Sequence, residues 1–318
     1  MAIFKATTPT RISLAGGGTD VDPYSKHFGG AVINMAINIY QHVELYIGDD
    51  MWSVTNQNFP YDADPKLFYK ILTIYGREGM HKATVVSDFD GFMNAGLGSS
   101  GSAAVCLIGA LRKEQNKSLD RLDIVEEAYD IEVNKLKWHG GRQDQIAAAF
   151  GGLNSIGFGK KTTISQFTRE DAEALKEWMV LFYIGKRQST SDKIQRSFKK
   201  LSGQQIASLN YLRDRVISVG LSIQSSNFEL LGKIIDELWQ YKKESNKNVS
   251  NSKIDEIYDY ALKHGAIGGK LMGAGGGGYM FFICDPKKQH SLIFQMAKKG
   301  IENIDFSPDF NGLQVRRL

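Results

Sequence analysis

Three glycine clusters are the places where this chain could bring its backbone close to a ligand. The first follows a short apolar segment and consists of Gly16, Gly17, Gly18, Thr19 and Asp20. Because glycine has no side chain, a ligand can approach this backbone and the adjacent carboxylate closely. The segment is either a ligand-binding loop or a glycine-rich hairpin in which Asp20 is a turn residue.

The second cluster directly precedes a long apolar segment and has the composition of an anion site. It runs through Gly96, Leu97, Gly98, Ser99, Ser100, Gly101 and Ser102. A helix that begins with glycines and serines presents free N–H groups and the positive end of its dipole to a phosphate, and its hydroxyls can reach Mg²⁺. The alternative is an ordinary helix N-cap, although a cap requires one such residue and not six.

The third cluster reads GGKLMGAGGGG over residues 268–278 and precedes an apolar strand. It is either a flexible hairpin or a loop whose backbone approaches a ligand, which would offset the entropy that glycine loses on folding. Both later clusters contain the spacing G-x-G-x-x-G, so a nicotinamide-dependent oxidoreductase is an alternative. That site expects a strand after the first helix, whereas residues 119–136 indicate a second helix.

Two carboxylates between the clusters have unusual positions. Glu132 lies beside the apolar stripe of an amphipathic segment, where a charged group needs a partner. It is either a boundary residue paired with a cation such as Lys135 or a ligand of a divalent cation. Asp144 precedes the alanine-rich segment 145–150, where a plain N-cap is one interpretation.

The elements that position these residues follow from hydrophobic periodicity. Residues 31–47 are typical of paired strands and residues 84–88 of a further strand. Residues 103–112, apolar on all sides, predict a buried helix, and residues 119–136 an amphipathic one. The other predicted elements are a short helix at 145–150, a strand at 178–184, two helices within 203–245, a helix at 252–264, strands flanking 273–278 and a helix at 291–299. A mixed α+β or α/β chain follows, with a domain boundary near residue 172.

Composition excludes several classes of protein. The 318 residues suffice for two domains at ~100–200 residues each. The net charge of only +4 makes nucleic acid and membrane surfaces poor partners. No apolar run reaches the ~20 residues of a membrane helix, and the N-terminus lacks a secretory signal, so a cytoplasmic protein is expected. Cys106 and Cys284 lie in apolar segments and are expected to be buried free thiols.

Together, the three clusters and the acids between them resemble the motifs of the GHMP small-molecule kinases, such as galactokinase, homoserine kinase and mevalonate kinase. The resemblance spans residues 9–278, with the motifs in the same order. Within the family, PTRISLAGGGTD is most similar to the branch of D-glycero-D-manno-heptose 7-phosphate kinases, and more distantly to L-fucokinases. It implies a two-domain α+β fold with a ribosomal-S5-domain-2-like N-terminal domain over 1–172, a ferredoxin-like C-terminal domain over 173–318, and an active site between them.

The resemblance also implies ATP and Mg²⁺ as cofactors and a role for each motif. The segment from Gly96 to Ser102 would wrap the triphosphate, with Ser100 and Glu132 at the metal. Asp144, in GRQDQ and twelve residues after Glu132, would be the catalytic aspartate that accepts or orients the proton of the attacking hydroxyl.

The remaining positions implied by the resemblance concern the acceptor and the catalytic cation. Arg11 would sit by the catalytic aspartate. The first cluster would bind the substrate, with Asp20 as the best candidate to hold sugar hydroxyls. The third cluster would shape the triphosphate and acceptor pocket through Gly273, Gly275 and Gly276.

One departure from the family bears on the acceptor. Galactokinases carry Glu-His-Thr-Asp where this chain has Gly17-Gly18-Thr19-Asp20, so two side chains that would hold galactose are absent. The expected partner is a small-molecule sugar phosphate, phosphorylated on its anomeric hydroxyl to give a 1,7-bisphosphate. Arg187, in GKRQSTS, is a candidate for the second phosphate, with a solvated turn as its alternative.

Three alternatives remain for the activity as a whole. An L-fucokinase or a galactokinase-like sugar 1-kinase would differ only in its acceptor. A non-catalytic nucleotide or sugar-phosphate binding protein would keep the glycines and lose the chemistry, which the intact Glu132, Asp144 and Arg11 disfavour. No nucleic acid or membrane partner is expected, and the chain is expected to be a monomer or a homodimer.

Overall fold

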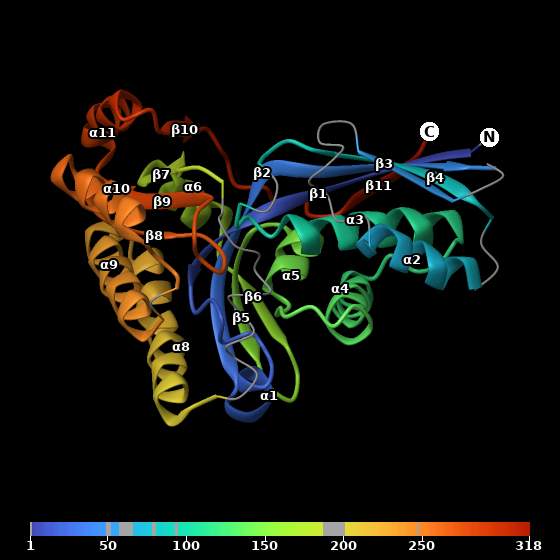
Figure 1. The fold of residues 1–318 in the computed structure, drawn as a ribbon, viewed down its shortest axis with the longest axis horizontal. Helices are drawn as coiled ribbons and strands as arrows, with labels where there is room; N and C mark the ends of the chain where they lie inside the picture. Colours follow the sequence, from blue (N-terminus) through green and yellow to red (C-terminus); the bar gives the residue numbers. More distant parts are fainter. Residues whose placement is uncertain are drawn as a thin grey trace.

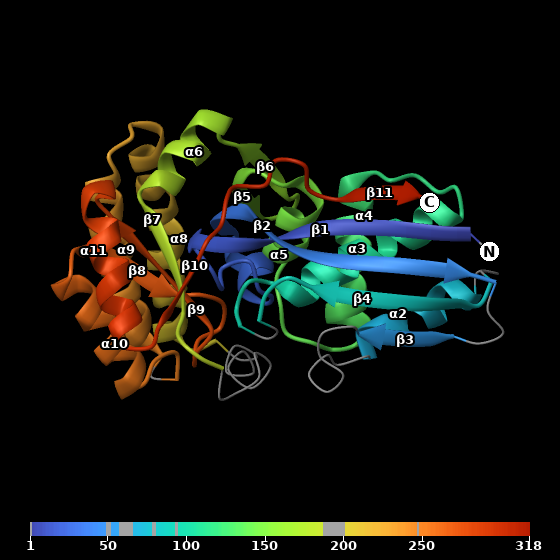
Figure 2. The same ribbon diagram turned by 90° about the horizontal axis from the view of Figure 1, so that it is seen from above.

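The computed structural model describes residues 2–48, 52–56, 66–77, 81–92, 95–186, 201–246 and 248–318. Two sheets lie side by side, each with helices packed against it (Figures 1 and 2). The first glycine cluster follows the first strand of the chain, the second precedes its third helix, and the third runs from the end of one strand of the second sheet to the start of the next. The expected mixed α+β architecture is therefore confirmed.

The first sheet consists of β1 (Ala2–Ala15), β2 (Gly30–Ile47), β3 (Ser53–Asn56), β4 (Ala83–Phe89), β5 (Leu153–Phe158), β6 (Thr163–Gln166) and β11 (Gln314–Arg317). Its order is β11-β1-β2-β4-β3, and β5 joins β2 to β6. Residues 31–47, predicted as paired strands, form most of the single long strand β2, which pairs with β1, β4 and β5. The last strand, β11, returns from the second sheet to β1, so the two termini lie at the same end (Figure 2).

Helices cover one face of this sheet (Figure 1). They are α2 (Lys66–Arg77), α3 (Ser99–Glu114), α4 (Arg121–Tyr129) and α5 (Gln143–Phe150), while the short helix α1 (Tyr24–Phe28) lies at one end of β2. The predicted buried helix is confirmed as α3, which is apolar on all sides because it contacts β1, β2, α2, α4 and α5 at once. Each fully buried Leu or Ile in it contributes roughly 1.5–3 kcal/mol of apolar burial.

The predicted amphipathic helix at 119–136 differs in detail. It begins at Arg121 because the Asp120 side chain accepts the N–H of Asp123 as an N-cap. Its last part, Asp130–Lys135, is a π-helical turn. Such a turn inserts an extra residue into the helix and is common at functional sites. Here the turn buries Ile131 and Glu132.

The second sheet contains β7 (Met179–Tyr183), β8 (Ala266–Leu271), β9 (Tyr279–Cys284) and β10 (Glu302–Ile304), in the order β10-β7-β9-β8 and antiparallel throughout. Its helices are α6 (Arg169–Glu177), α8 (Gly203–Gln224), α9 (Phe228–Ser245), α10 (Ser252–Lys263) and α11 (Pro286–Lys298). The last helix begins earlier than predicted because Asp285 caps it and Pro286 occupies its first position. Helices between β7 and β8 and between β9 and β10 give the βαββαβ connectivity of a ferredoxin-like domain.

The two sheets share a hydrophobic core. Leu14 and Ile33 from the first sheet lie in the same buried cluster as Phe281 from the second sheet and as Val219 and Leu231 from α8 and α9, the helices packed with it. The boundary near residue 172 stays a prediction. Both cysteines are buried free thiols, as expected.

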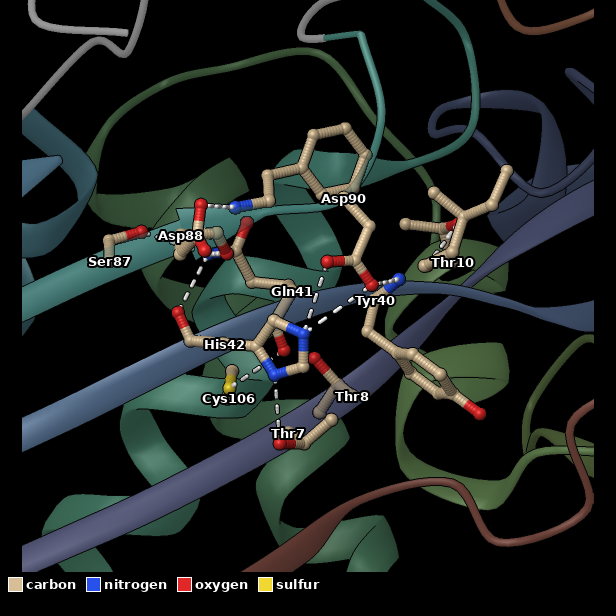
Figure 3. Close-up of polar contacts among 12 residues, drawn as sticks. Thr7, Thr8, Thr10, Tyr40, Gln41, His42, Ser87, Asp88, Asp90 and Cys106 are labelled. Atoms are coloured by element: carbon tan, nitrogen blue, oxygen red, sulfur yellow. Dashed lines mark hydrogen bonds and ion pairs between the residues drawn. The ribbon is translucent and has the colours of Figure 1, made fainter. Parts of the chain in front are cut away.

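The pairing of β1 with β2 contains a bulge, which bends the strands on the way to the glycine clusters. The register shifts between Pro9, which pairs with Tyr40, and Thr10, which pairs with Ile37. Proline lacks an N–H and suits a break in the ladder, and bulges bend the strand that carries them. Side chains fasten the sheet here: Thr10 Oγ1 donates to the Ile39 carbonyl (2.8 Å), and His42 lies between Thr7 and Asp90 (Figure 3).

Candidate active site

Arg11 on β1 and Asp144 on α5 form an ion pair beside the second glycine cluster. Arg11 Nε and Nη2 lie 2.7 and 2.6 Å from Asp144 Oδ1, and Arg11 Nη1 donates to the Gly96 carbonyl (2.6 Å). Arg11 is only 4% exposed, whereas the Asp144 side chain is 27% exposed. Asp144 is the second residue of α5 and its carboxylate pairs with Arg11, so it does not act as the N-cap that its position also allowed.

The second glycine cluster packs directly on Asp144. Gly98 precedes α3 with a φ of +77°, and a Cβ atom there would lie 2.8 Å from Asp144 Cγ. A Cβ atom at Gly101 would lie 2.8 Å from Asp144 Cβ. The main chain of Leu97 joins the cluster to β1, because Arg11 N donates to the Leu97 carbonyl (3.0 Å). Glycine is therefore required here for contact with the carboxylate.

The serines of this cluster have different environments. Ser100 is exposed and donates a hydrogen bond to Glu132, while Ser99 is half-buried. Ser102 is fully buried, and its hydroxyl bonds to Thr8 Oγ1 (2.8 Å) and donates to the Pro9 carbonyl (3.0 Å). The side chain of Ser102 thus fastens α3 to β1 and does not face the open side of the loop.

Glu132 is a buried carboxylate that lacks a cation partner among the described residues. It is 7% exposed and accepts hydrogen bonds from Ser100 and from Gln145 Nε2. Burial raises the pKa of Glu132 to about 7, and the Asp144 carboxylate acts in the same direction. The salt bridge to Lys135 considered from the sequence is not formed, because Lys135 pairs with Asp130 (3.0 Å).

The first glycine cluster is a folded turn with Asp20 at its end. Thr19 Oγ1 donates to the carbonyls of Gly16 (2.8 Å) and Ala31 (2.9 Å), which closes the turn. Asp20 accepts the Gly18 N–H (3.1 Å), and both of its oxygens accept from Gln143 Nε2 (3.1 Å). Burial raises the pKa of Asp20, and the nearby charge of Asp144 raises it further.

The end of the third cluster is hydrogen-bonded to the segment that directly precedes the second. Tyr279 N donates to the Ala95 carbonyl (2.9 Å) and Gly278 N to the Gly185 carbonyl (2.8 Å). A Cβ atom at Gly278 would overlap the Ala95 carbonyl oxygen. Gly273, Gly275 and Gly276 continue this turn, all with positive φ. The structure therefore places the first and second clusters beside the Arg11–Asp144 pair and joins the third cluster to Ala95, which directly precedes the second.

Arg187 lies outside the described residues, so its expected contact with a second phosphate stays a prediction. Three residues around the site were not singled out from the sequence: Gln143, Gln145 and Lys270. Gln143 Oε1 and Gln145 Oε1 are buried with no hydrogen-bond partner among the described residues, as is Ser13 Oγ. The glutamines flank Asp144 in the sequence, which was the available signal. Nothing in the sequence indicated that Lys270 belongs to the site, since a lysine is normally exposed.

Comparison with known proteins shows to which family of enzymes the chain is similar. The family model of the GHMP kinases N-terminal domain matches residues 66–152, and that of the GHMP kinases C-terminal domain matches residues 221–302. The chain is 30% identical to a D-glycero-alpha-D-manno-heptose 7-phosphate kinase of Campylobacter jejuni, with 100% of both chains covered. It is 24% identical to an L-fucokinase/L-fucose-1-P guanylyltransferase of Bacteroides fragilis over 98% of this chain and 38% of that longer protein.

The fold has a counterpart among solved structures. A D-glycero-D-manno-heptose 1-phosphate kinase from Bacteroides thetaiotaomicron superposes with a TM-score of 0.81 at 22% identity, over 99% of both chains. Fold, site and relatives together define a phosphotransferase with an alcohol group as acceptor, and not a nicotinamide-dependent oxidoreductase. The chain belongs to the GHMP kinase family, as its motifs implied, and as a kinase it uses ATP. Within the described residues, no helix is long and apolar enough to cross a membrane.

Proposed function

We propose that this kinase transfers the γ-phosphoryl group of ATP to the anomeric hydroxyl of D-glycero-D-manno-heptose 7-phosphate, giving the 1,7-bisphosphate. The observation that carries this choice is the full-length similarity to a heptose 7-phosphate kinase. The turn at Gly17 and Gly18 supports it, since it offers bare backbone where a galactokinase would carry two side chains. Fucokinases are more distant relatives.

Asp144 is placed between the two substrates in this proposal. Its carboxylate abuts Gly98 on the nucleotide side, and on the sugar side it lies near enough to Asp20 to raise the pKa of that residue. Arg11 holds the Asp144 carboxylate in place through Oδ1. The carboxylate can then accept, or orient, the proton of the anomeric hydroxyl as the hydroxyl attacks phosphorus.

The α3 N-terminus, from Gly96 to Gly101, would hold the triphosphate, because its N–H groups and dipole favour an anion. The third cluster would form the other side of the triphosphate and acceptor pocket, on the side of the second sheet, through Gly273, Gly275 and Gly276. Asp20 would accept hydrogen bonds from the sugar, with Gln143 fixing its orientation through both carboxylate oxygens.

The residues around Glu132 fit a Mg²⁺ ion. A buried carboxylate without a cation partner in the described chain, next to a hydroxyl and a buried amide oxygen that has no partner there, offers the oxygen ligands that Mg²⁺ prefers. Glu132, Ser100 and Gln145 would hold the ion. When bound, Mg²⁺ offsets the negative charge of the phosphates.

The decisive experiment is an ATP-dependent phosphorylation screen. The purified protein is incubated with ATP, Mg²⁺ and a panel of heptose 7-phosphate, free heptose, L-fucose and galactose, and products are identified by phosphorus NMR. We expect a new anomeric phosphate on the heptose 7-phosphate. Phosphorylation of fucose or galactose alone would favour the alternative sugar 1-kinases, and binding without any product would favour a non-catalytic protein. The cytoplasmic location, the monomer or homodimer state and the boundary near residue 172 are further proposals.

A further inference from the structure

A buried lysine stands where the two sheets meet. Lys270, in β8, is 7% exposed, and its side-chain nitrogen Nζ donates to the main-chain carbonyl of Ser13 in β1 (3.0 Å). In the part of the chain that the structure describes, Lys270 forms no ion pair with a carboxylate. Removing a cation from water without an anionic partner is costly, so its position calls for an explanation.

Two other cations lie close to Lys270. Lys242, on α9, donates to the Gly273 carbonyl in the third cluster (3.3 Å), and Arg11 belongs to the catalytic pair. Burial lowers the pKa of Lys270 well below its usual range, and the positive charges of Lys242 and Arg11 lower it further. The arrangement repels positive charge and is complementary to an anion.

A pocket opens at this point. It is lined by Lys242 and Lys270, by the main chain at Gly16 and Gly17, by Trp239 on α9, and by the apolar residues Leu14, Ala15, Leu212 and Leu238. The Trp239 side chain is 1% exposed, and its Nε1 has no hydrogen-bond partner among the described residues. Indole nitrogen and ammonium groups are donors only. The side-chain polar groups of this pocket therefore favour an oxygen-rich anion.

We propose that Lys270, Lys242 and the Gly16–Gly17 turn form a subsite for a phosphate group carried by one of the two substrates. The phosphate belongs either to the acceptor sugar or to the terminal position of ATP, and both present the same chemistry. The adjoining turn is the one assigned to the acceptor, which favours the sugar's own phosphate. In that form the inference rests on the proposed function.

The test compares three variants by calorimetric titration. Lys242→Met and Lys270→Met remove one ammonium each. Lys243→Met is the matched control, because Lys243 neighbours Lys242 on α9 but bonds to Asp255 (3.1 Å). The probes are heptose 7-phosphate, free heptose and a non-hydrolysable ATP analogue. We expect both subsite variants to weaken heptose 7-phosphate binding about tenfold or more, with the other two probes and the control within about twofold of wild type.

The outcomes distinguish a phosphate of the sugar from a phosphate of ATP, and failure of the proposed subsite from failure of the proposed acceptor. Weaker binding of the ATP analogue alone would assign the subsite to the terminal phosphate. Binding of all probes within twofold of the Lys243→Met control would overturn the subsite. If wild type binds free heptose as tightly as heptose 7-phosphate, the proposed acceptor fails, while the ATP arm still decides the subsite. If Lys270→Met does not fold, half-buried Lys242 provides the same test.

Discussion

Arg11 and Asp144, 133 residues apart in sequence, meet through a single carboxylate oxygen: Arg11 Nε and Nη2 both contact Asp144 Oδ1. The other oxygen, Oδ2, faces Gly98, whose Cβ position is 3.0 Å away. Among the described residues no donor binds Oδ2. One oxygen thus holds the carboxylate in place, and the other is directed toward the loop proposed to hold the triphosphate.

Asp144→Asn should lower turnover by at least ~100-fold, in the range of general acid–base contributions, while ATP-analogue binding changes little. The amide keeps the shape of the side chain and loses its charge and basicity. Asp123→Asn, an exposed acid in the first turn of α4, is the control and should turn over normally. Turnover of Asp144→Asn within about tenfold of wild type, a loss of only ~1.4 kcal/mol, would rule out the catalytic assignment.

Glu132→Gln should raise the Mg²⁺ concentration needed for half-maximal rate by about tenfold or more, because an amide is a poorer ligand for a hard cation. High Mg²⁺ should restore part of the rate. Glu126→Gln, which removes an exposed partner of Arg142, should behave as wild type in the same metal titration. Unchanged metal dependence in Glu132→Gln would assign Glu132 a structural role.

Gly98→Val should abolish binding of an ATP analogue, measured by titration, while circular dichroism stays close to wild type. The new side chain would strain a backbone with positive φ and displace the Asp144 carboxylate. Gly140→Val is the control, because nothing lies within 4 Å of a Cβ atom there. Normal nucleotide affinity in Gly98→Val would mean that this loop does not hold the triphosphate.

Lys270 should make the stability of the ligand-free protein depend on pH. Its pKa is lowered in the folded state, so between that lowered pKa and the ordinary value of ~10.5 the unfolded chain binds a proton that the folded chain does not. Stability therefore rises with pH. Between pH 7 and 9, the free energy of unfolding of wild type should rise relative to that of Lys270→Met, by at most about 1.4 kcal/mol per pH unit. Parallel denaturation profiles for the two proteins would show that Lys270 is charged when folded.

The sequence predicted the parts of the site that depend on local composition. Runs of glycine and serine before a buried helix have few other uses, so the α3 loop could be identified directly. The direction of each side chain within a run depends on tertiary packing, which is why Ser102 was grouped with the loop although its hydroxyl faces β1.

Other features required the fold. The π-helical turn at Asp130–Lys135 has no sequence signature comparable to helical periodicity, and it buries Glu132. The contact of Lys270 with Ser13 joins residues 257 positions apart, so the sequence pattern could not reveal it. Residues 31–47 are one strand, β2, and not the paired strands that their composition predicts. The strand is long because it pairs with three different neighbours, β1, β4 and β5.

The central claim is the identity of the acceptor, and a steady-state comparison tests it most directly. The ratio kcat/KM is measured with ATP and Mg²⁺ for heptose 7-phosphate, free heptose, galactose and L-fucose. We expect the value for heptose 7-phosphate to exceed the others by about tenfold or more, the size of one or two charge-assisted contacts to a phosphate. A higher kcat/KM for any unphosphorylated sugar would contradict the proposed acceptor.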